Sequence, residues 1–442
     1  MMRVRLLGAV LVLVSILALS QAESGGQEYI VTLKSGHSIS AVNNAHGTHT
    51  VRHIRHTPIY LVKSSGDDTV LIDLQNDKHV ESAEKNAKVK LRSNSQQASL
   101  IGGLSDAMTS LLDGHTLTMF YGTSVLKSYV EQPALTVAHV NEVRSLSTGA
   151  GTRVAYIDTG VDPYHPALRP WLDPGVDLLN DRSVSELDGL SDAMTSLLDD
   201  AMTSLLDKRF FFALDDAMTS LLDGDRDTAP FPPAFGHGTL VAGVIHVVAP
   251  DARIVPIKAF DPYGNTTMFS IIEGVYRAKD LGVDVLNMSF STTRESVTLR
   301  KAIADAWASG VAVVASVGND GKNVSNVYPA SYPGVFGVGA TDFNDHLASF
   351  SNYGKPVSIV AIGAFVISTA PGGRYAAAWG TSFSAPMVSG AIALLAQTRG
   401  QGHSDSSKVI NTADYIDNLN PAYSSQLGKG RINVQQALKD KN

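Results

Sequence analysis

The sequence predicts an α/β fold: a doubly wound, mostly parallel sheet with helices on both faces, preceded by a small α+β unit. Apolar runs of strand length recur from residue 154 onward, and segments with helical periodicity alternate with them. At 299–307 apolar residues fall at i, i+3, i+4, i+7 and i+8, and 268–275 shows similar spacing. Buried strands that alternate with helices form parallel sheets covered on both sides. We expect strands at 154–157, 253–260, 283–288, 311–317, 335–340 and 357–362.

Length and composition limit the possible classes of protein. The chain has 442 residues, of which 44% are hydrophobic and 17% charged, so it can fold into two or three units with a large core. Its net charge of -7 argues against a nucleic-acid partner, because a protein that binds nucleic acid needs a basic surface. Cysteine is absent, which excludes disulfide scaffolds, thiolate metal sites and cysteine nucleophiles.

The N-terminus has the pattern of an export signal. Arg3 and Arg5 precede an apolar run of 14 residues, 6–19, and the small residues Ser20 and Ala22 follow. A run of this length is short for a membrane span, which needs about 20 residues. The alternatives are a buried helix or a membrane anchor. We expect a signal peptide at 1–22, cleaved after Ala22, and a secreted chain with no membrane association after its removal.

Two further segments precede the predicted sheet. Residues 23–92 form the small α+β unit, with strands expected at 29–33 and 59–62 and a further candidate at 70–74. Residues 93–127 are rich in Ser, Gly and Gln and show no sustained periodicity, so we expect a linker. The α/β domain then covers 128–442.

An acidic insertion with an internal repeat lies at 186–227. It carries 11 acidic and 3 basic residues, and three of four copies of the string DAMTSLLD. The interpretation we favour is a duplicated surface insertion with a solvated acidic face; the alternative is a partner-binding or calcium-binding excursion. Asp223, Asp225 and Asp227 resemble the start of an EF-hand loop, but the Gly and Glu that such a loop needs further on are missing. The copies are 106–113, 192–199, 200–207 and 216–223.

Three short strings carry candidate catalytic residues. Asp158 ends a buried apolar run, His237 stands between two glycines at the start of an apolar helix, and Ser382 opens another helix in the string 380–386. Each residue by itself also has an ordinary structural interpretation: Asp158 as a turn residue, His237 as a structural histidine and Ser382 as a helix N-cap. We expect Pro386 near the first turn of its helix, where a missing N–H costs little.

The three strings together resemble the subtilisin-like serine proteases, or subtilases, over roughly 130–440, and 28–92 resembles their inhibitory propeptide. The resemblance implies a serine endopeptidase that works through an acyl-enzyme intermediate, with Asp158, His237 and Ser382 as the catalytic triad. Asn319, after the run 311–317, resembles the side chain that stabilises the oxyanion. It also implies protein or peptide substrates, inhibition by the chain's own propeptide and no cofactor for the chemistry. Members often bind structural calcium, but we match no metal ligands here, and we expect a monomer.

The same resemblance implies a substrate-binding edge and a specificity pocket. Ser289, Phe290 and Ser291 resemble the segment that pairs with extended substrate backbone, and Ser291 stands where the family commonly has glycine. Ser316, Val317 and Gly318 are expected to form one wall of the pocket, with Val327 near its base. Because these strings carry no charge, we expect small or apolar substrate side chains.

Two other functions fit less well. An esterase of the α/β-hydrolase type has G-x-S-x-G at its nucleophile and its acid and histidine after it, whereas here Ser384 replaces the last glycine and both partners come first. A non-catalytic scaffold would be free to lose triad residues, and none is lost. The separation of Asp158 and His237 is unusually long, because the insertion lies between them.

Overall fold

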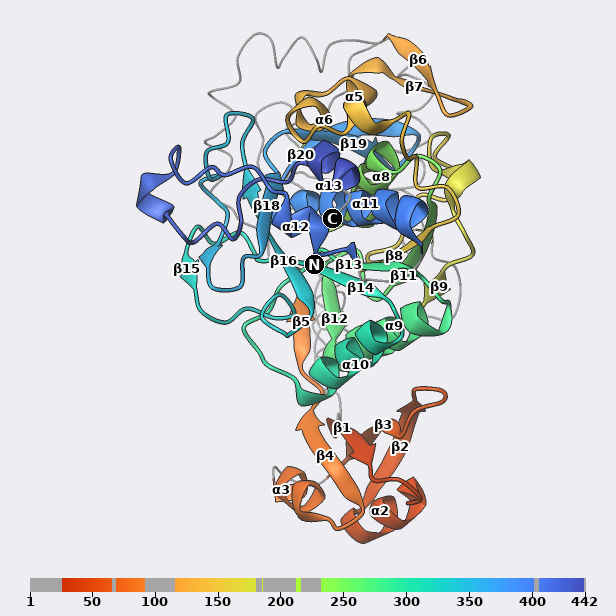
Figure 1. Cartoon of the computed structure of the whole chain (residues 1–442). Helices are drawn as coiled ribbons and strands as arrows, with labels where there is room; N and C mark the ends of the chain where they lie inside the picture. The colour runs from red at the N-terminus through yellow and green to blue at the C-terminus, as the bar shows by residue number, and fades with distance from the viewer. Residues whose placement is uncertain are drawn as a thin grey trace, which may run out of the picture. The chain divides into compact units, whose positions relative to one another are not determined.

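The computed structural model describes residues 26–65, 69–91, 116–179, 185, 212–215, 232–400 and 405–440 (Figure 1). The chain divides into two compact units, residues 1–86 and 87–442. The expected signal peptide, most of the expected linker and all four copies of the repeat lie outside the described residues.

The first unit is a small α+β fold, as predicted. Its antiparallel sheet has the order β2-β3-β1-β4, and its core contains Tyr29, Val31 and Val62. The candidate strand at 70–74 is wrong, because these residues lie in a helix whose buried Val70 and Leu74 are one turn apart. The elements are β1 (Gln27–Leu33), α2 (Ile39–His46), β2 (Thr48–His53), β3 (Ile59–Ser64), α3 (Thr69–Asn76) and β4 (Val80–Lys85).

The second unit is built on a seven-stranded parallel sheet, which confirms the predicted fold class. Its strand order is β18-β16-β14-β13-β8-β11-β9, and every neighbouring pair is parallel. All six expected strands are present with small shifts at their ends. The strands are β8 (Arg153–Asp158), β9 (Val176–Asp177), β11 (Arg253–Lys258), β13 (Val285–Met288), β14 (Ala312–Ser316), β16 (Val335–Thr341) and β18 (Ile359–Ile362).

Two pairs of helices cover this sheet. Helices α8 (His237–Val248) and α11 (Thr381–Arg399) pack on each other and lie on one face, while α9 (Met268–Asp280) and α10 (Val297–Ala308) pack together on the other (Figure 1). Every residue of α8 is buried. The Arg144 guanidinium donates to the Val247 carbonyl at 2.6 Å, which places a positive charge at the C-terminal end of α8, where it is favourable.

The strand order creates the crevice in which a site can form. After β8 the chain adds β9 and β11 on one side of the sheet, and then returns to add β13, β14, β16 and β18 on the other. The switch point therefore lies between β8 and β13. Ligands of doubly wound sheets bind at such a point, beyond the carboxyl ends of the strands. Asp158 ends β8, and Ser289 directly follows β13.

The structure corrects the expected boundaries of the linker. Strands β6 (Leu117–Phe120) and β7 (Thr123–Leu126) form an antiparallel hairpin, and α5 (Lys127–Val130) follows directly. Strands of four residues are too short to show an alternating pattern. The other end also differs, because β5 (Lys88–Lys90) pairs with β12 (Asn265–Thr267) inside the second unit. Residues 87–91 thus belong structurally to the second unit, where β5 and β12 form a two-stranded sheet of their own, and not to the preceding α+β fold.

Short elements complete the second unit. Strand β10, within the acidic insertion, pairs in parallel with β20, and β20 pairs antiparallel with β19. These elements are α6 (Pro133–Val137), β10 (Phe212–Asp215), β15 (Asn323–Val324), β17 (Tyr353–Gly354), β19 (Val366–Ala370), β20 (Arg374–Trp379), α12 (Lys408–Asn411) and α13 (Val434–Lys439).

Candidate active site

Asp158 lies at the carboxyl end of β8, and its side chain is fully buried. Its Oδ1 accepts the Thr159 N–H at 2.8 Å, and its backbone carbonyl accepts from the N–H groups of Ala259 and Phe260. The first of these bonds, with the one from His237, holds Oδ1, and the other two fix the backbone at the end of β8. The strand end therefore holds this carboxylate in one orientation.

His237 is the first residue of α8, and the glycine after it determines how closely the helix approaches Asp158. A Cβ on Gly238 would collide with the carbonyl oxygen of Gly160 and would lie 3.1 Å from both the nitrogen and the carbonyl carbon of that residue. The Gly238 N–H also donates to Thr159 Oγ1 at 3.0 Å. Only glycine permits this contact between the start of α8 and the turn after β8.

The result is a short hydrogen bond between two buried side chains. His237 Nδ1 lies 2.7 Å from Asp158 Oδ1, and an ionised carboxylate can only accept, so the imidazole donates. This fixes the tautomer in which Nε2 carries no proton, the form in which that nitrogen can act as a base. The 79-residue separation of the two residues in the chain leaves the contact intact.

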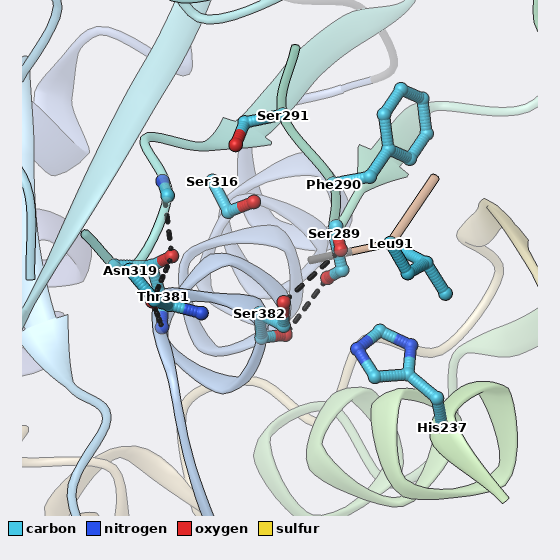
Figure 2. A pocket seen from close by; sticks show the side chains of 10 residues that line it. Leu91, His237, Ser289, Phe290, Ser291, Ser316, Asn319, Thr381 and Ser382 are labelled. Atoms are coloured by element: carbon cyan, nitrogen blue, oxygen red, sulfur yellow. Dashed lines mark hydrogen bonds between the residues drawn. The ribbon is translucent and has the colours of Figure 1, made fainter. Parts of the chain in front are cut away.

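Ser382 is the second residue of α11, and a proline four residues later shapes its surroundings. Pro386 lies inside the helix and not in its first turn, which corrects the expectation from sequence. Its missing N–H leaves the Ser382 carbonyl without its usual helical donor. Ser289 Oγ supplies the replacement at 2.8 Å, and Ser382 Oγ donates to the Ser289 carbonyl at 3.1 Å (Figure 2). The segment after β13 and the start of α11 are thus joined at the candidate nucleophile.

Asn319 follows β14, and Thr381 sets the orientation of its amide. The Thr381 N–H and Oγ1 donate to Asn319 Oδ1 at 2.9 and 2.8 Å. Because a backbone N–H can only donate, the atom that faces it must be the oxygen. The NH₂ group of Asn319 is therefore the part of the amide left to donate elsewhere. Sequence reasoning missed Thr381, although it stands inside the same string as Ser382.

His237, Ser382, Asn319 and Thr381 line one pocket, and Asp158 is connected to it through its bond to His237. In Figure 2, Ser382 lies between His237 on one side and Asn319 with Thr381 on the other. Of the substrate-binding residues expected from sequence, Val317 and Val327 are not among the described residues that line the pocket. Val317 is fully buried, and Asn352 Nδ2 donates to its carbonyl. The lining residues are Leu91, His237, Ser289, Phe290, Ser291, Ser316, Gly318, Asn319, Thr381 and Ser382.

Leu91 is the lining residue that sequence reasoning did not anticipate. The segment 87–91 runs antiparallel to β12, and the Leu91 N–H donates to the Gly264 carbonyl at 2.8 Å. Ala87, Val89 and Leu91 are buried, whereas the two lysines between them are exposed. This alternation with period two is a strand signal that was present in the sequence.

Comparisons with known proteins identify the family. The subtilase family model matches residues 149–430, which is more than half of the chain. The chain belongs to the subtilase family.

Relatives of this subtilase include several named serine proteinases. It is 29% identical to thermitase of Thermoactinomyces vulgaris over 66% of this chain and 90% of that protein. It is 39% identical to a thermophilic serine proteinase of Bacillus sp. (strain AK1) over 46% of this chain, and spans about half of that protein, 52%. The fold of this subtilase is also that of fervidolysin from Fervidobacterium pennivorans, with a TM-score of 0.66, 21% identity and coverage of 96% of this chain and 62% of that one.

Among the described residues, no three His, Asp or Glu side chains gather as a metal site. The helices in that part of the chain include none that is both long and apolar enough to cross a membrane.

Proposed function

We propose that this subtilase is a secreted serine endopeptidase that hydrolyses peptide bonds through an acyl-enzyme intermediate. The observation that carries the proposal is the 2.7 Å bond from His237 Nδ1 to Asp158 Oδ1, in a pocket that His237 shares with Ser382 and Asn319. A serine hydroxyl is a weak nucleophile and requires a base that is itself held in place by a third group. These residues can supply both.

In the first half of the reaction, the Ser382 hydroxyl turns from the Ser289 carbonyl towards His237. His237 Nε2 takes the proton as Ser382 Oγ bonds to the substrate carbonyl carbon. The Asp158 carboxylate stabilises the imidazolium that forms. The C–N bond then breaks, and Nε2 gives the proton to the leaving amine. In the second half, a water molecule attacks the ester in the same way and releases the acid and Ser382.

The oxyanion formed in both halves needs donors on the opposite side of Ser382. The Asn319 NH₂ group is available because its oxygen is held by Thr381, and the Ser382 N–H lies at the positive end of α11. Such donors act mainly in the transition state. Removing the Asn319 donor should therefore lower kcat on the order of 10²–10³-fold, which is the magnitude that loss of such a donor has in subtilisin.

Substrate is proposed to bind as an added strand along Ser289, Phe290 and Ser291. Main-chain hydrogen bonds supply affinity in this mode, and pockets supply specificity. A Cβ added to Gly318 would lie 2.7 Å from Ser291 Oγ, so Gly318 and Ser291 are close neighbours in the pocket wall, and neither carries a charge. We therefore expect substrates with a small or apolar side chain directly before the scissile bond. A cleavage profile dominated by Lys or Arg would contradict the preference.

The α+β unit is proposed to act as an intramolecular inhibitor and folding aid. Support comes from residues 87–91, which pair with β12 and bring Leu91 into the pocket beside His237. With Leu91 in the pocket, part of the space that a substrate would enter beside His237 and Ser289 is occupied. Parallel sheets fold slowly because their contacts are non-local, which gives a template a physical purpose.

N-terminal sequencing of protein secreted from the full chain tests activity and self-maturation together. We expect the wild type to begin beyond residue 91, and a Ser382→Ala variant to keep its propeptide segment and to hydrolyse no peptide. Equal processing of the two chains would count against self-maturation. Equal peptide hydrolysis by the two would remove Ser382 as the nucleophile.

A further inference from the structure

We propose that Asn352 is a positioning residue that holds the Asn319 loop in its catalytic geometry. This inference rests on the proposed function, since it concerns the oxyanion donor of that reaction. The Asn319 loop is residues 317–322. Asn352 lies between β16 and β17, 30 to 35 residues from this loop in sequence, and only 1% of its surface is exposed. It is not among the described residues that line the pocket.

All four hydrogen-bonding positions of the Asn352 amide are used, and all four partners belong to the Asn319 loop. Its Oδ1 accepts the N–H groups of Asp320 and Lys322 at 3.0 and 3.1 Å. Its Nδ2 donates to the Val317 carbonyl at 2.9 Å and to Asp320 Oδ2 at 3.3 Å. An amide has two donors and two acceptor positions, so this side chain is fully satisfied.

The bonds fall on both sides of Asn319. Asn352 N–H donates to the Gly318 carbonyl at 2.9 Å, so the residues immediately before and after Asn319 are both tied to Asn352. The fit is close, because a Cβ on Gly318 would lie 2.8 Å from Asn352 Nδ2. Thr381 fixes the Asn319 amide from the pocket side, and Asn352 fixes the backbone beneath it.

This arrangement makes a specific kinetic prediction. A donor to the oxyanion acts in the transition state, so loosening its loop should lower kcat and leave KM unchanged. A displacement of about 1 Å at a catalytic group can cost on the order of 10²-fold. We therefore expect a loss of about ten- to 100-fold, smaller than removal of the Asn319 donor itself.

The test uses Asn352→Ser, which is too short to reach the loop, and Asn352→Asp, which keeps the acceptor oxygen but loses the donors and adds charge beside Asp320. Each is made in the full chain with Asn319 intact and with Asn319→Ala. Hydrolysis of a peptide p-nitroanilide is measured per active site titrated with a fluorophosphonate. Asn433→Ser is the matched control: this buried Asn caps α13 and donates to Asp414, and none of these partners lines the pocket.

The expected result is a lower kcat with unchanged KM for both Asn352 variants, unchanged kcat for Asn433→Ser, and little further loss when Asn352 variants are added to Asn319→Ala. A full additional loss in that background would overturn the proposal, because Asn352 would then act by another route. Retained kcat in both variants, or failure of both to fold, would overturn it too. A wild type that neither turns over nor labels would instead refute the proposed function.

Discussion

Gly238→Ala tests how the structure brings His237 to Asp158. The added Cβ would collide with the Gly160 carbonyl oxygen and lie 3.1 Å from two further backbone atoms, none of which belongs to a flexible side chain. Non-bonded atoms are comfortable at about 3.5 Å or more, so the start of α8 has to move away from the turn after β8 by about 1 Å. The 2.7 Å bond between the two side chains would then exceed hydrogen-bonding distance.

The expected consequence is a loss of about 10²-fold in kcat for peptide hydrolysis, with a smaller change in KM. Gly282→Ala serves as the control. Gly282 has a φ of +63°, and no atom lies within 4 Å of its added Cβ, so this change should cost about 1–2 kcal/mol of stability without altering kcat. Folded Gly238→Ala protein with a kcat within about threefold of wild type would refute the reasoning.

Three further predictions concern single side chains: Thr381, Ser289 and His246. Thr381→Val keeps the backbone donor to Asn319 but removes the hydroxyl, and should lower kcat about tenfold at constant KM; a raised KM with unchanged kcat would contradict this. Ser289→Ala leaves the Ser382 carbonyl with neither a helical donor nor a hydroxyl, and should cost about 1–3 kcal/mol in urea unfolding of a Ser382→Ala protein. Burial, with the Arg144 charge a smaller cause, lowers the pKa of His246 from 6.5 to about 3. As the pH falls, His246 is protonated in the unfolded chain before it is protonated in the folded one. The free energy of unfolding should therefore decrease by about 1.4 kcal/mol per pH unit as the pH falls from 6.5 towards 3. His246→Phe should lose that slope, and an unchanged slope would assign it to other groups.

Periodicity predicted six of the seven strands of the parallel sheet and missed β9, which has two residues. The six apolar runs all became strands of the parallel sheet, because a strand buried on both faces has an apolar pattern that does not depend on its neighbours. The strand predicted at 70–74 was wrong because five residues rich in apolar side chains fit a strand or one helical turn equally well. The hairpin at 117–126 was not predicted for a similar reason, since its strands have only four residues each.

The site was predicted in part. The resemblance of short strings to the subtilases pointed to Asp158, His237, Ser382 and Asn319. The structure brings Asp158 to His237, and His237, Ser382 and Asn319 to one pocket, while their catalytic roles belong to the proposed function. The groups that orient them could not be recognised from those strings, although Thr381 stands directly before Ser382. The bond from Ser289 to the Ser382 carbonyl depends on a proline that lies deeper in α11 than expected, and the bonds from Asn352 depend on loops that are distant in sequence.

Covalent labelling of the secreted protein with a fluorophosphonate, followed by mapping of the labelled peptide, tests the activation of Ser382 most directly. We predict a single label on Ser382, lost in Ser382→Ala and strongly slowed in His237→Ala. Labelling on another residue, or labelling of Ser382 at the same rate without the imidazole, would contradict the claim that His237 and Asp158 activate this hydroxyl.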